Sequence, residues 1–235
     1  MNYGATISVV VAALNEESGI GPTLSEIQDV LPDHHLIVVD GNSEDNTVEI
    51  AKNLGADIAF QPGVGKGDAM AEGLKKLNQN SRFVVFTDAD YTYPAKFIPK
   101  MVELLERSPK IGMVIGDRFH GSQNQDKASK NVFYIGNRII ATIQYLLNGI
   151  KLNDPLSGLR VVRTEIVRNW KPLSKGFDVE VEINAVVERE GYEIAEVPID
   201  YRARLGEKKL RPRHGIEIFR RIISVSMGEL PHLDR

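Results

Sequence analysis

Short runs of large apolar residues alternate along the chain with longer stretches of mixed polarity. Four of these runs predict buried strands of a parallel sheet, whose strands are covered on both faces; they span residues 6–11, 36–40, 58–60 and 83–86. The stretches between them predict four helices: one that ends near Leu31 with Ser18 as its N-cap, and three over residues 48–54, 67–77 and 97–105. This alternation predicts an α/β fold with a doubly wound, mostly parallel sheet.

The fourth predicted strand leads into two carboxylates, Asp88 and Asp90. Parallel strands present their C-terminal ends at one edge, where open α/β sheets bind ligands. Two anionic side chains at that edge suit a hard divalent cation that carries a substrate diphosphate. An Asp-x-Asp triplet is also common as a plain polar turn, so its meaning depends on the rest of the chain.

Composition limits the functional classes. The chain has 235 residues, of which 42% are hydrophobic and 26% charged, so it is long enough for a large core in one domain or in one domain with an appendage. The formal net charge of -3 gives no general affinity for nucleic acid, and we predict no nucleic-acid partner. The chain contains no cysteine, which excludes disulfides and thiolate chemistry and suits a cytoplasmic protein.

A glycine-rich stretch, residues 61–68, does not match the known phosphate-binding loops. A Walker loop needs Ser or Thr after its Gly-Lys pair and a glycine five positions before the lysine, where this chain has Gly67 and Gln61. A dinucleotide fingerprint needs a third glycine at the position of Asp68. What remains is a flexible loop with Lys66 before a helix, which either approaches a nucleotide or only turns the chain.

Several motifs, in chain order, resemble the family 2 glycosyltransferases of the GT-A fold, a Rossmann-like nucleotide-sugar-binding fold. They lie at residues 15–17, 38–43 with Asp45 and Thr47, 65–67 and 87–90. Later motifs are similar to the polyprenyl-phosphate or dolichyl-phosphate sugar synthases of that family; they lie at residues 115–119, 153–160, 176–177 with Glu182, 197–199 and 204–210. The resemblance covers roughly residues 5 to 225. It implies one domain over residues 1–235, with a donor-nucleotide and metal half (1–120) and an acceptor half (121–235).

The resemblance implies where a nucleotide-diphosphate sugar binds. Ala12, Leu14 and Glu16 fall where the family contacts the base and ribose of the donor. Val38 and Asp40 fall where it closes the base pocket. The family usually has proline at position 12, so the alanine is expected to loosen the first loop.

For the metal, the resemblance implies Mg2+ or Mn2+ held by the catalytic pair Asp88 and Asp90 against the donor diphosphate. Ala89 and Lys66 belong to the same donor site. Thr92 replaces a side-chain amide of the family pattern, and it is expected to be a weaker metal ligand. Charge neutralisation on the departing nucleotide is worth several kcal/mol in such a transition state.

The acceptor side is expected to be basic, because the implied acceptor is polyprenyl or dolichyl phosphate. Arg118 follows the strand-like residues 113–115, and Arg204 and Lys209 lie in a segment, residues 202–213, with six Lys or Arg and one acid. Arginine binds phosphate oxygens bidentately, and lysine adds a mobile charge. Such a charge run is usually a solvated face; the family motif makes it a phosphate clamp that closes over both substrates.

A lipid phosphate is ionised near neutral pH, with a second pKa near about 6, so transfer with inversion needs no strong general base. We therefore expect Asp154, Asp178, Glu180 and Glu182 to make structural hydrogen bonds. A soluble or glycan hydroxyl acceptor is the alternative, and it would make Glu180 or Glu182 an essential base. A non-catalytic nucleotide-sugar-binding module is the second alternative.

Membrane access is expected from the surface. Residues 132–150 are interrupted by polar side chains and fall short of the roughly 20 apolar residues of a bilayer span. Residues 132–147 and 216–223 are amphipathic and basic, and they either lie at the headgroups or pack against the sheet. We expect peripheral attachment at the cytoplasmic face of a membrane, directly or through a membrane-anchored partner.

Overall fold

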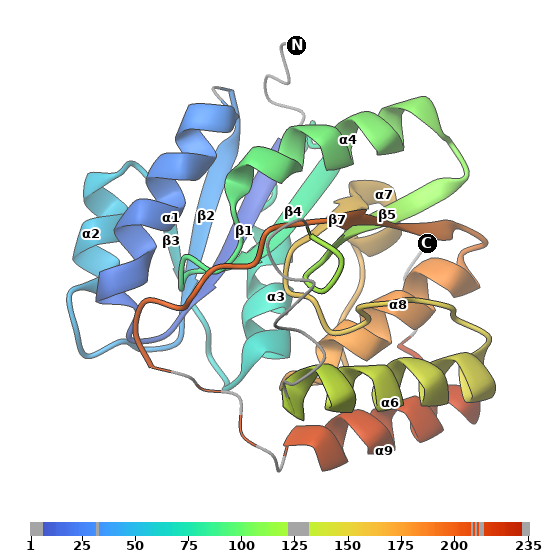
Figure 1. The fold of residues 1–235 in the computed structure, drawn as a ribbon. Helices are drawn as coiled ribbons and strands as arrows, with labels where there is room; N and C mark the ends of the chain where they lie inside the picture. The colour runs from blue at the N-terminus through green and yellow to red at the C-terminus, as the bar shows by residue number, and fades with distance from the viewer. Residues whose placement is uncertain are drawn as a thin grey trace.

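A seven-stranded sheet organises the protein (Figure 1). The computed structural model describes residues 7–31, 33–121, 132–207, 209, 211 and 214–231. The strand order is β3-β2-β1-β4-β6-β5-β7, and β6 alone runs antiparallel to its neighbours in this sheet. The predicted doubly wound, mostly parallel sheet is confirmed. The strands are β1 (Ile7–Ala13), β2 (His35–Asp40), β3 (Asp57–Phe60), β4 (Phe83–Asp88), β5 (Ile111–Asp117), β6 (Arg160–Arg163) and β7 (Glu193–Pro198).

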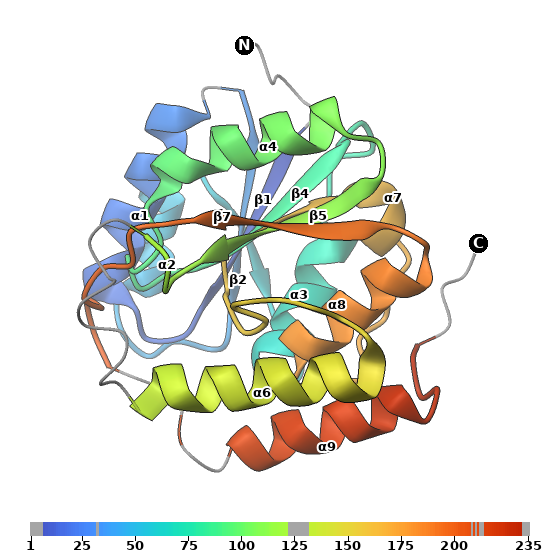
Figure 2. The same ribbon diagram turned by 45° about the vertical axis from the view of Figure 1, so that its right-hand side comes forward.

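Helices cover both faces of the sheet, as Figure 2 shows from a second side. One apolar cluster joins the sheet to α1 (Glu17–Val30), α2 (Thr47–Asn53) and α4 (Ile98–Arg107), which follows the short 3-10 helix η2 (Ala95–Phe97). The other joins it to α3 (Lys66–Lys75), α7 (Thr164–Val167) and α8 (Val179–Arg189). Alternate residues of β1 enter the two clusters, because successive strand side chains point to opposite faces.

The start of α1 differs from the prediction. Ser18 lies within the first turn of the helix and is not its N-cap, because α1 begins at Glu17. The backbone N–H of Glu16 donates instead to the side chain of Thr47, the first residue of α2 (2.8 Å), and that of Glu17 to the side chain of Asp45, in the loop between β2 and α2 (3.0 Å). The prediction was wrong because the cap comes from a distant loop, which a local pattern does not reveal.

Two further helices, α6 (Val132–Asn148) and α9 (His214–Ser226), lie against one another beyond α8 (Figure 2). Their inner faces form a small apolar cluster with α8 through Ile218, Ile222 and Val181. Their outer faces carry large apolar side chains in contact with solvent: Ile135, Ile139, Leu146, Ile216, Phe219, Ile223 and Met227, which we call the outer apolar face. Among the described helices, none combines the length and apolar character that a bilayer crossing requires.

Candidate active site

Three neighbouring strands end together at the carboxyl edge of the sheet. Ala13 pairs with Asp40, and Ala12 pairs with Asp88, so β1, β2 and β4 deliver their following residues to one place. Glu16 comes three residues after the end of β1, and Asp90 two residues after the end of β4. This edge is where ligands bind in open α/β sheets.

Lys66 is held between two carboxylates. Its ammonium lies 2.6 Å from Asp88 Oδ1 and 2.9 Å from Glu180 Oε1, in the first turn of α8. Burial alone lowers the pKa of Lys66, but the charges of Asp88 and Glu180 outweigh burial and raise the pKa above its ordinary value. Burial raises the pKa of Glu180, and the Lys66 charge opposes that effect. Lys66 is therefore a charged group beside the first aspartate.

The glycine-rich loop places Lys66 by docking on a distant backbone segment. The N–H of Gly67 donates to the carbonyl of Lys175 (2.8 Å), and a Cβ at Gly67 would lie 1.9 Å from the carbonyl oxygen of Ser174. Gly65 has φ +93°, a conformation that favours glycine. The glycines thus let the backbone of this loop lie against residues 174–175, and this contact fixes the position of Lys66.

Asp90 is buried, with an exposed fraction of 1%, and its partners are Thr92 and Arg204. The hydroxyl of Thr92 donates to Oδ1 (2.6 Å), and the Arg204 guanidinium pairs with Oδ2. Burial raises the pKa of Asp90 and the charge of Asp88 adds to this, while Thr92 and Arg204 oppose it. The buried hydroxyl of Thr92 is thus directed at Asp90 and orients that carboxylate, and a bond from Thr92 to a metal stays a prediction.

The basic segment lies over the same edge. Lys209 Nζ is 2.5 Å from Glu16 Oε1, and Arg204 Nη1 is 3.2 Å from the same oxygen. The N–H of Leu205 donates to the carbonyl of Asp90 (3.1 Å), which ties the segment to the aspartate motif. Burial raises the pKa of Glu16, and Lys209 and Arg204 oppose it. Two residues of the predicted phosphate clamp thus lie beside the predicted donor and metal residues.

Two predicted base-pocket residues lie behind the surface. Val38 has no exposed area and packs in the apolar cluster under α1. Asp40 has none either, and its carboxylate accepts hydrogen bonds from the N–H (2.8 Å) and hydroxyl (2.5 Å) of Ser43. Both residues support the end of β2 and the loop that follows it, and their contact with a base stays a prediction. Leu14, by contrast, is 38% exposed at the edge.

The remaining predicted donor residues differ in exposure. Ala12 is partly exposed at the end of β1. Ala89 is buried, and its carbonyl accepts a hydrogen bond from the Thr23 hydroxyl of α1 (3.3 Å). Ala89 therefore anchors the aspartate motif on α1 through its backbone.

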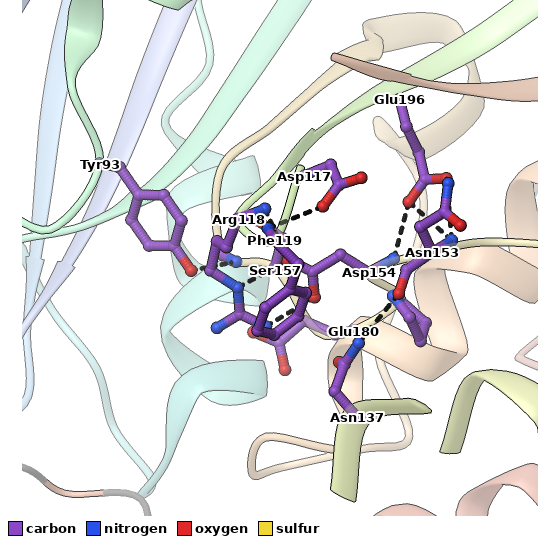
Figure 3. A network of polar contacts seen from close by, with 12 residues as sticks. Tyr93, Asp117, Arg118, Phe119, Asn137, Asn153, Asp154, Ser157, Glu180 and Glu196 are labelled. Atoms are coloured by element: carbon purple, nitrogen blue, oxygen red, sulfur yellow. Dashed lines mark hydrogen bonds and ion pairs between the residues drawn. The ribbon is translucent and has the colours of Figure 1, made fainter. Parts of the chain in front are cut away.

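Arg118 forms a two-pronged ion pair with Asp154 (Figure 3). Its Nε and Nη2 each lie 2.7 Å from a carboxylate oxygen, and Asp154 is fully buried. Glu182 accepts hydrogen bonds from the Trp170 indole (3.0 Å) and the Ser174 N–H (2.7 Å). Asp154 and Glu182 therefore make the structural hydrogen bonds that we expected of them.

Sequence reasoning gave no role to Arg160 or Tyr93, and both position the loop of residues 154–158. Arg160 is 1% exposed and donates to the carbonyls of Ser157 (2.8 Å) and Pro155 (2.7 Å). Tyr93 Oη accepts a hydrogen bond from the N–H of Gly158 (2.7 Å). A Cβ at Gly158 would lie 2.6 Å from Asp88 Oδ2, so this loop closes directly on the first aspartate. The family motif at residues 153–160 was the available signal, but it did not specify these contacts.

The donor set determines which metal arrangement fits. Within the described part of the chain, no three Asp, Glu or His side chains converge as a metal site. Asp88 and Asp90 alone would supply carboxylate oxygens, and the Asp88 side chain is 24% exposed. Mg2+ and similar ions are commonly held by one or two carboxylates together with substrate phosphates. The residues therefore fit a divalent cation that binds with a diphosphate.

Comparisons with known proteins agree with this geometry. The sequence model of glycosyl transferase family 2 matches residues 8–170. A dolichyl-phosphate hexose transferase of Haloferax volcanii is 33% identical over 227 residues, which are 95% of each chain. A dolichol-phosphate mannosyltransferase of Pyrococcus furiosus is 28% identical, over 95% of this chain and 64% of that relative.

Solved structures share the fold. Glucosyl-3-phosphoglycerate synthase from Mycobacterium tuberculosis, in complex with Mn2+, UDP and glucosyl-3-phosphoglycerate, matches with a TM-score of 0.73 and 25% identity, over 97% of this chain and 81% of that one. The same enzyme has also been solved with Mg2+ and UDP. These neighbours bind a divalent cation together with a nucleotide, which supports divalent-metal use here. The chain therefore has the GT-A fold and belongs to glycosyl transferase family 2, as a glycosyltransferase related to the dolichyl-phosphate hexose transferases.

Proposed function

We propose that this enzyme transfers a hexose, with inversion, from a nucleotide-diphosphate sugar to dolichyl or polyprenyl phosphate, and so supplies lipid-linked sugar for glycosylation. GDP-mannose, UDP-glucose and UDP-GlcNAc are the donors we consider. The observation that carries the proposal is the position of Arg204 and Lys209 beside Glu16 and Asp90. Cations at this place suit an acceptor that is itself a phosphate.

On the donor side, Asp88 and Asp90 would hold Mg2+ or Mn2+. When bound, the metal neutralises charge on the departing nucleoside diphosphate. In this proposal Glu16 and Leu14 contact the base and ribose, and Lys66 contacts the diphosphate. Donor identity is proposed to depend on Ala12, at the end of β1, and on Thr92, after β4, where the chain departs from the family pattern.

On the acceptor side, a phosphate oxygen attacks the anomeric carbon as the bond from that carbon to the nucleoside diphosphate breaks. The electron pair leaves with the diphosphate, and no proton has to be removed from the attacking oxygen. Arg118, Arg204 and Lys209 are proposed to bind the acceptor phosphate. The absence of a free base near Asp88 supports this chemistry, since in the described structure Glu180 is paired with Lys66 and Asp154 with Arg118.

The outer apolar face offers a route to a lipid acceptor. Leu146 of α6 and Met227 are both 72% exposed, and Arg138 and Arg220 lie exposed on the same two helices. Apolar side chains of such helices enter the headgroup boundary, and basic residues there add about 1 kcal/mol each on anionic lipid. We propose peripheral attachment at the cytoplasmic face through these helices, directly or with a membrane-anchored partner. In this proposal residues 1–120 bind the donor and residues 121–235 the acceptor, within one domain.

The test is transfer from radiolabelled UDP- and GDP-sugars to dolichyl and polyprenyl phosphate, with Mg2+ or Mn2+. We expect organic-extractable product from one donor, and we expect its loss with chelator and in Asp90→Ala. Asp57→Ala is the matched control, because Asp57 is exposed and lies on edge strand β3, at the far side of β2 from the site. Metal-dependent transfer only to a soluble sugar would overturn the acceptor assignment and leave the donor site standing.

A hydroxyl acceptor is the second candidate. It is favoured by the glucosyl-3-phosphoglycerate bound in the structural neighbour and by the raised pKa of Glu180. In that case Glu180→Gln would abolish transfer to the hydroxyl acceptor, because the amide cannot take a proton. Retention of transfer to lipid phosphate in Glu180→Gln would exclude this candidate.

A further inference from the structure

The two carboxylates proposed to hold the metal each have a cation from the protein. Lys66 is paired with Asp88, and Arg204 with Asp90. Both cations have a second carboxylate, Glu180 for Lys66 and Glu16 for Arg204. Lys66 differs from Arg204 in burial, since its side chain is 9% exposed and that of Arg204 is 26% exposed. A divalent ion that approaches Asp88 therefore meets a buried ammonium already in place.

The backbone around Lys66 leaves the side chain little room to withdraw. Gly67 is bonded to the carbonyl of Lys175, and the space that a Cβ at Gly158 would fill lies 2.8 Å from Lys66 Nζ. Glu180 is fixed in turn, because Arg160 Nη1 donates to its backbone carbonyl (3.2 Å). Lys66 thus has two fixed anionic partners and no solvent-exposed alternative among the contacts described.

We propose that Lys66 blocks Asp88 against a free divalent cation, and that Glu180 is a positioning residue that keeps Lys66 at the site when a metal–nucleotide complex takes its place on Asp88. A free metal ion can bind Asp88 only if it displaces the Lys66 ammonium, which then keeps Glu180 as its one carboxylate partner. Loss of a partner by a buried charge is costly. A diphosphate brings new anionic oxygens for the same ammonium. Metal and nucleotide therefore bind with strong positive coupling. This inference rests on the proposed metal-dependent donor site.

The structure dictates opposite effects for two substitutions. Lys66→Met leaves Asp88 and Glu180 without their cation, so Mn2+ affinity without nucleotide should rise on the order of tenfold or more. Glu180→Gln keeps a hydrogen-bond acceptor for Lys66 but removes a negative charge, so Mn2+ affinity without nucleotide should fall. Coupling between metal and nucleotide should shrink in the first variant and grow in the second, since coupling is reciprocal between the two ligands.

The experiment measures free Mn2+ by electron paramagnetic resonance during titration of the full chain, alone and with UDP or GDP. Lys175→Met is the matched control: it makes the same charge change at an exposed side chain on the segment against which Gly67 docks. Thermal unfolding of each variant checks the fold. If Lys66→Met does not fold, Glu180→Gln still decides the matter through its nucleotide dependence.

Four outcomes are distinguishable. Tighter Mn2+ binding by Lys66→Met without nucleotide, together with reduced coupling, supports the inference. Equal Mn2+ binding by wild type, Lys66→Met and Lys175→Met overturns it while the proposed function stands. Tight binding of Mn2+ by the wild type without nucleotide also overturns it. No Mn2+ binding by any variant, even with UDP or GDP, overturns both the inference and the metal-dependent part of the proposed function.

Discussion

At the carboxyl edge of the sheet, charged side chains are buried and paired, whereas on the outer apolar face large apolar side chains lie in contact with solvent. Lys66, Glu180 and Asp90 have almost no exposed surface. Leu146 and Met227 have almost three-quarters of theirs. Both regions depart from the usual distribution, in which charged groups are exposed and large apolar groups are buried. The edge buries charged groups, and the outer apolar face exposes apolar ones.

The reversal has a different cost in each region. A buried charge is costly unless a partner and hydrogen bonds compensate it, and each buried charge at the edge has such a partner. An exposed apolar helix face is compensated only by something outside the chain. The charges at the edge are therefore compensated within the protein, while the outer apolar face is exposed among the described residues and is proposed to meet a lipid surface. The predictions below test each half of this contrast.

The largest effect is expected at the edge. Asp88→Asn keeps the size of the side chain but removes the charge that holds both Lys66 and the proposed metal. Sugar transfer should fall by about a hundredfold or more, as for other losses of transition-state charge stabilisation. Steady-state rates with saturating metal measure this, and Asp57→Asn should retain full activity.

At the outer apolar face, an added charge rather than a removed one should be harmful. Ile139→Glu combined with Ile223→Glu should weaken binding to liposomes containing anionic lipid by about tenfold or more, since each isoleucine contributes roughly 1.5–3 kcal/mol when buried. Co-sedimentation measures this effect. Donor binding should be unchanged, and Gln79→Glu, which adds one negative charge in the loop after α3, should bind liposomes like the wild type. Unaltered liposome binding by the double variant would remove the face from the proposal.

A third substitution tests how rigidly the edge is built. Gly67→Ala places a Cβ against the backbone carbonyl of Ser174, which cannot move aside without its own segment. We expect a loss of roughly 1–3 kcal/mol in the free energy of unfolding and weaker donor binding, because Lys66 shifts from Asp88. Denaturant unfolding measures the first and calorimetry the second. Gly215→Ala, where a Cβ meets nothing within 4 Å, should be neutral in both.

The smallest effect is expected from the ion pair of Glu26 and Arg202, whose side chains are only partly buried. Glu26 accepts two hydrogen bonds from Arg202, at 2.7 and 3.0 Å. Burial raises the pKa of Glu26, but the Arg202 hydrogen bond and charge and the Ala95 N–H outweigh it and lower the pKa below 4.5. The pair therefore stabilises the fold above pH 4.5, and this contribution disappears as the pH falls through the lowered pKa. Melting temperatures of wild type and Glu26→Gln should differ slightly at pH 7 and converge as the pH falls through the lowered pKa of Glu26.

The strands of the first half could be predicted because each contains a run of mostly apolar residues. The strands β6 and β7 could not. Arg160 and Arg163 bound β6, so its sequence reads as a polar segment, although Arg160 is buried with its charge satisfied by carbonyls. β7 is an edge strand with exposed Glu193 and Pro198, and its apolar pattern is weak.

The site was predictable in kind but not in its pairings. The family motifs located Asp88, Asp90 and the basic segment, and the structure brings all three to one edge. The contact of Lys66 with Glu180 joins residues far apart in the chain, and no local pattern encodes it. The sequence likewise does not show how deeply a strand end is covered, as the complete burial of Val38 and Asp40 illustrates.

The place of β6 in the sheet has a consequence for how the chain is made. β4 and β5 are separated by β6, which is synthesised after both. During translation, the newly made β4 edge stays unpaired until residues 160–163 leave the ribosome, and β5 has no neighbour until then. An interrupted chain would present that open edge to other chains, so completion of the sheet and protection from aggregation coincide late in synthesis.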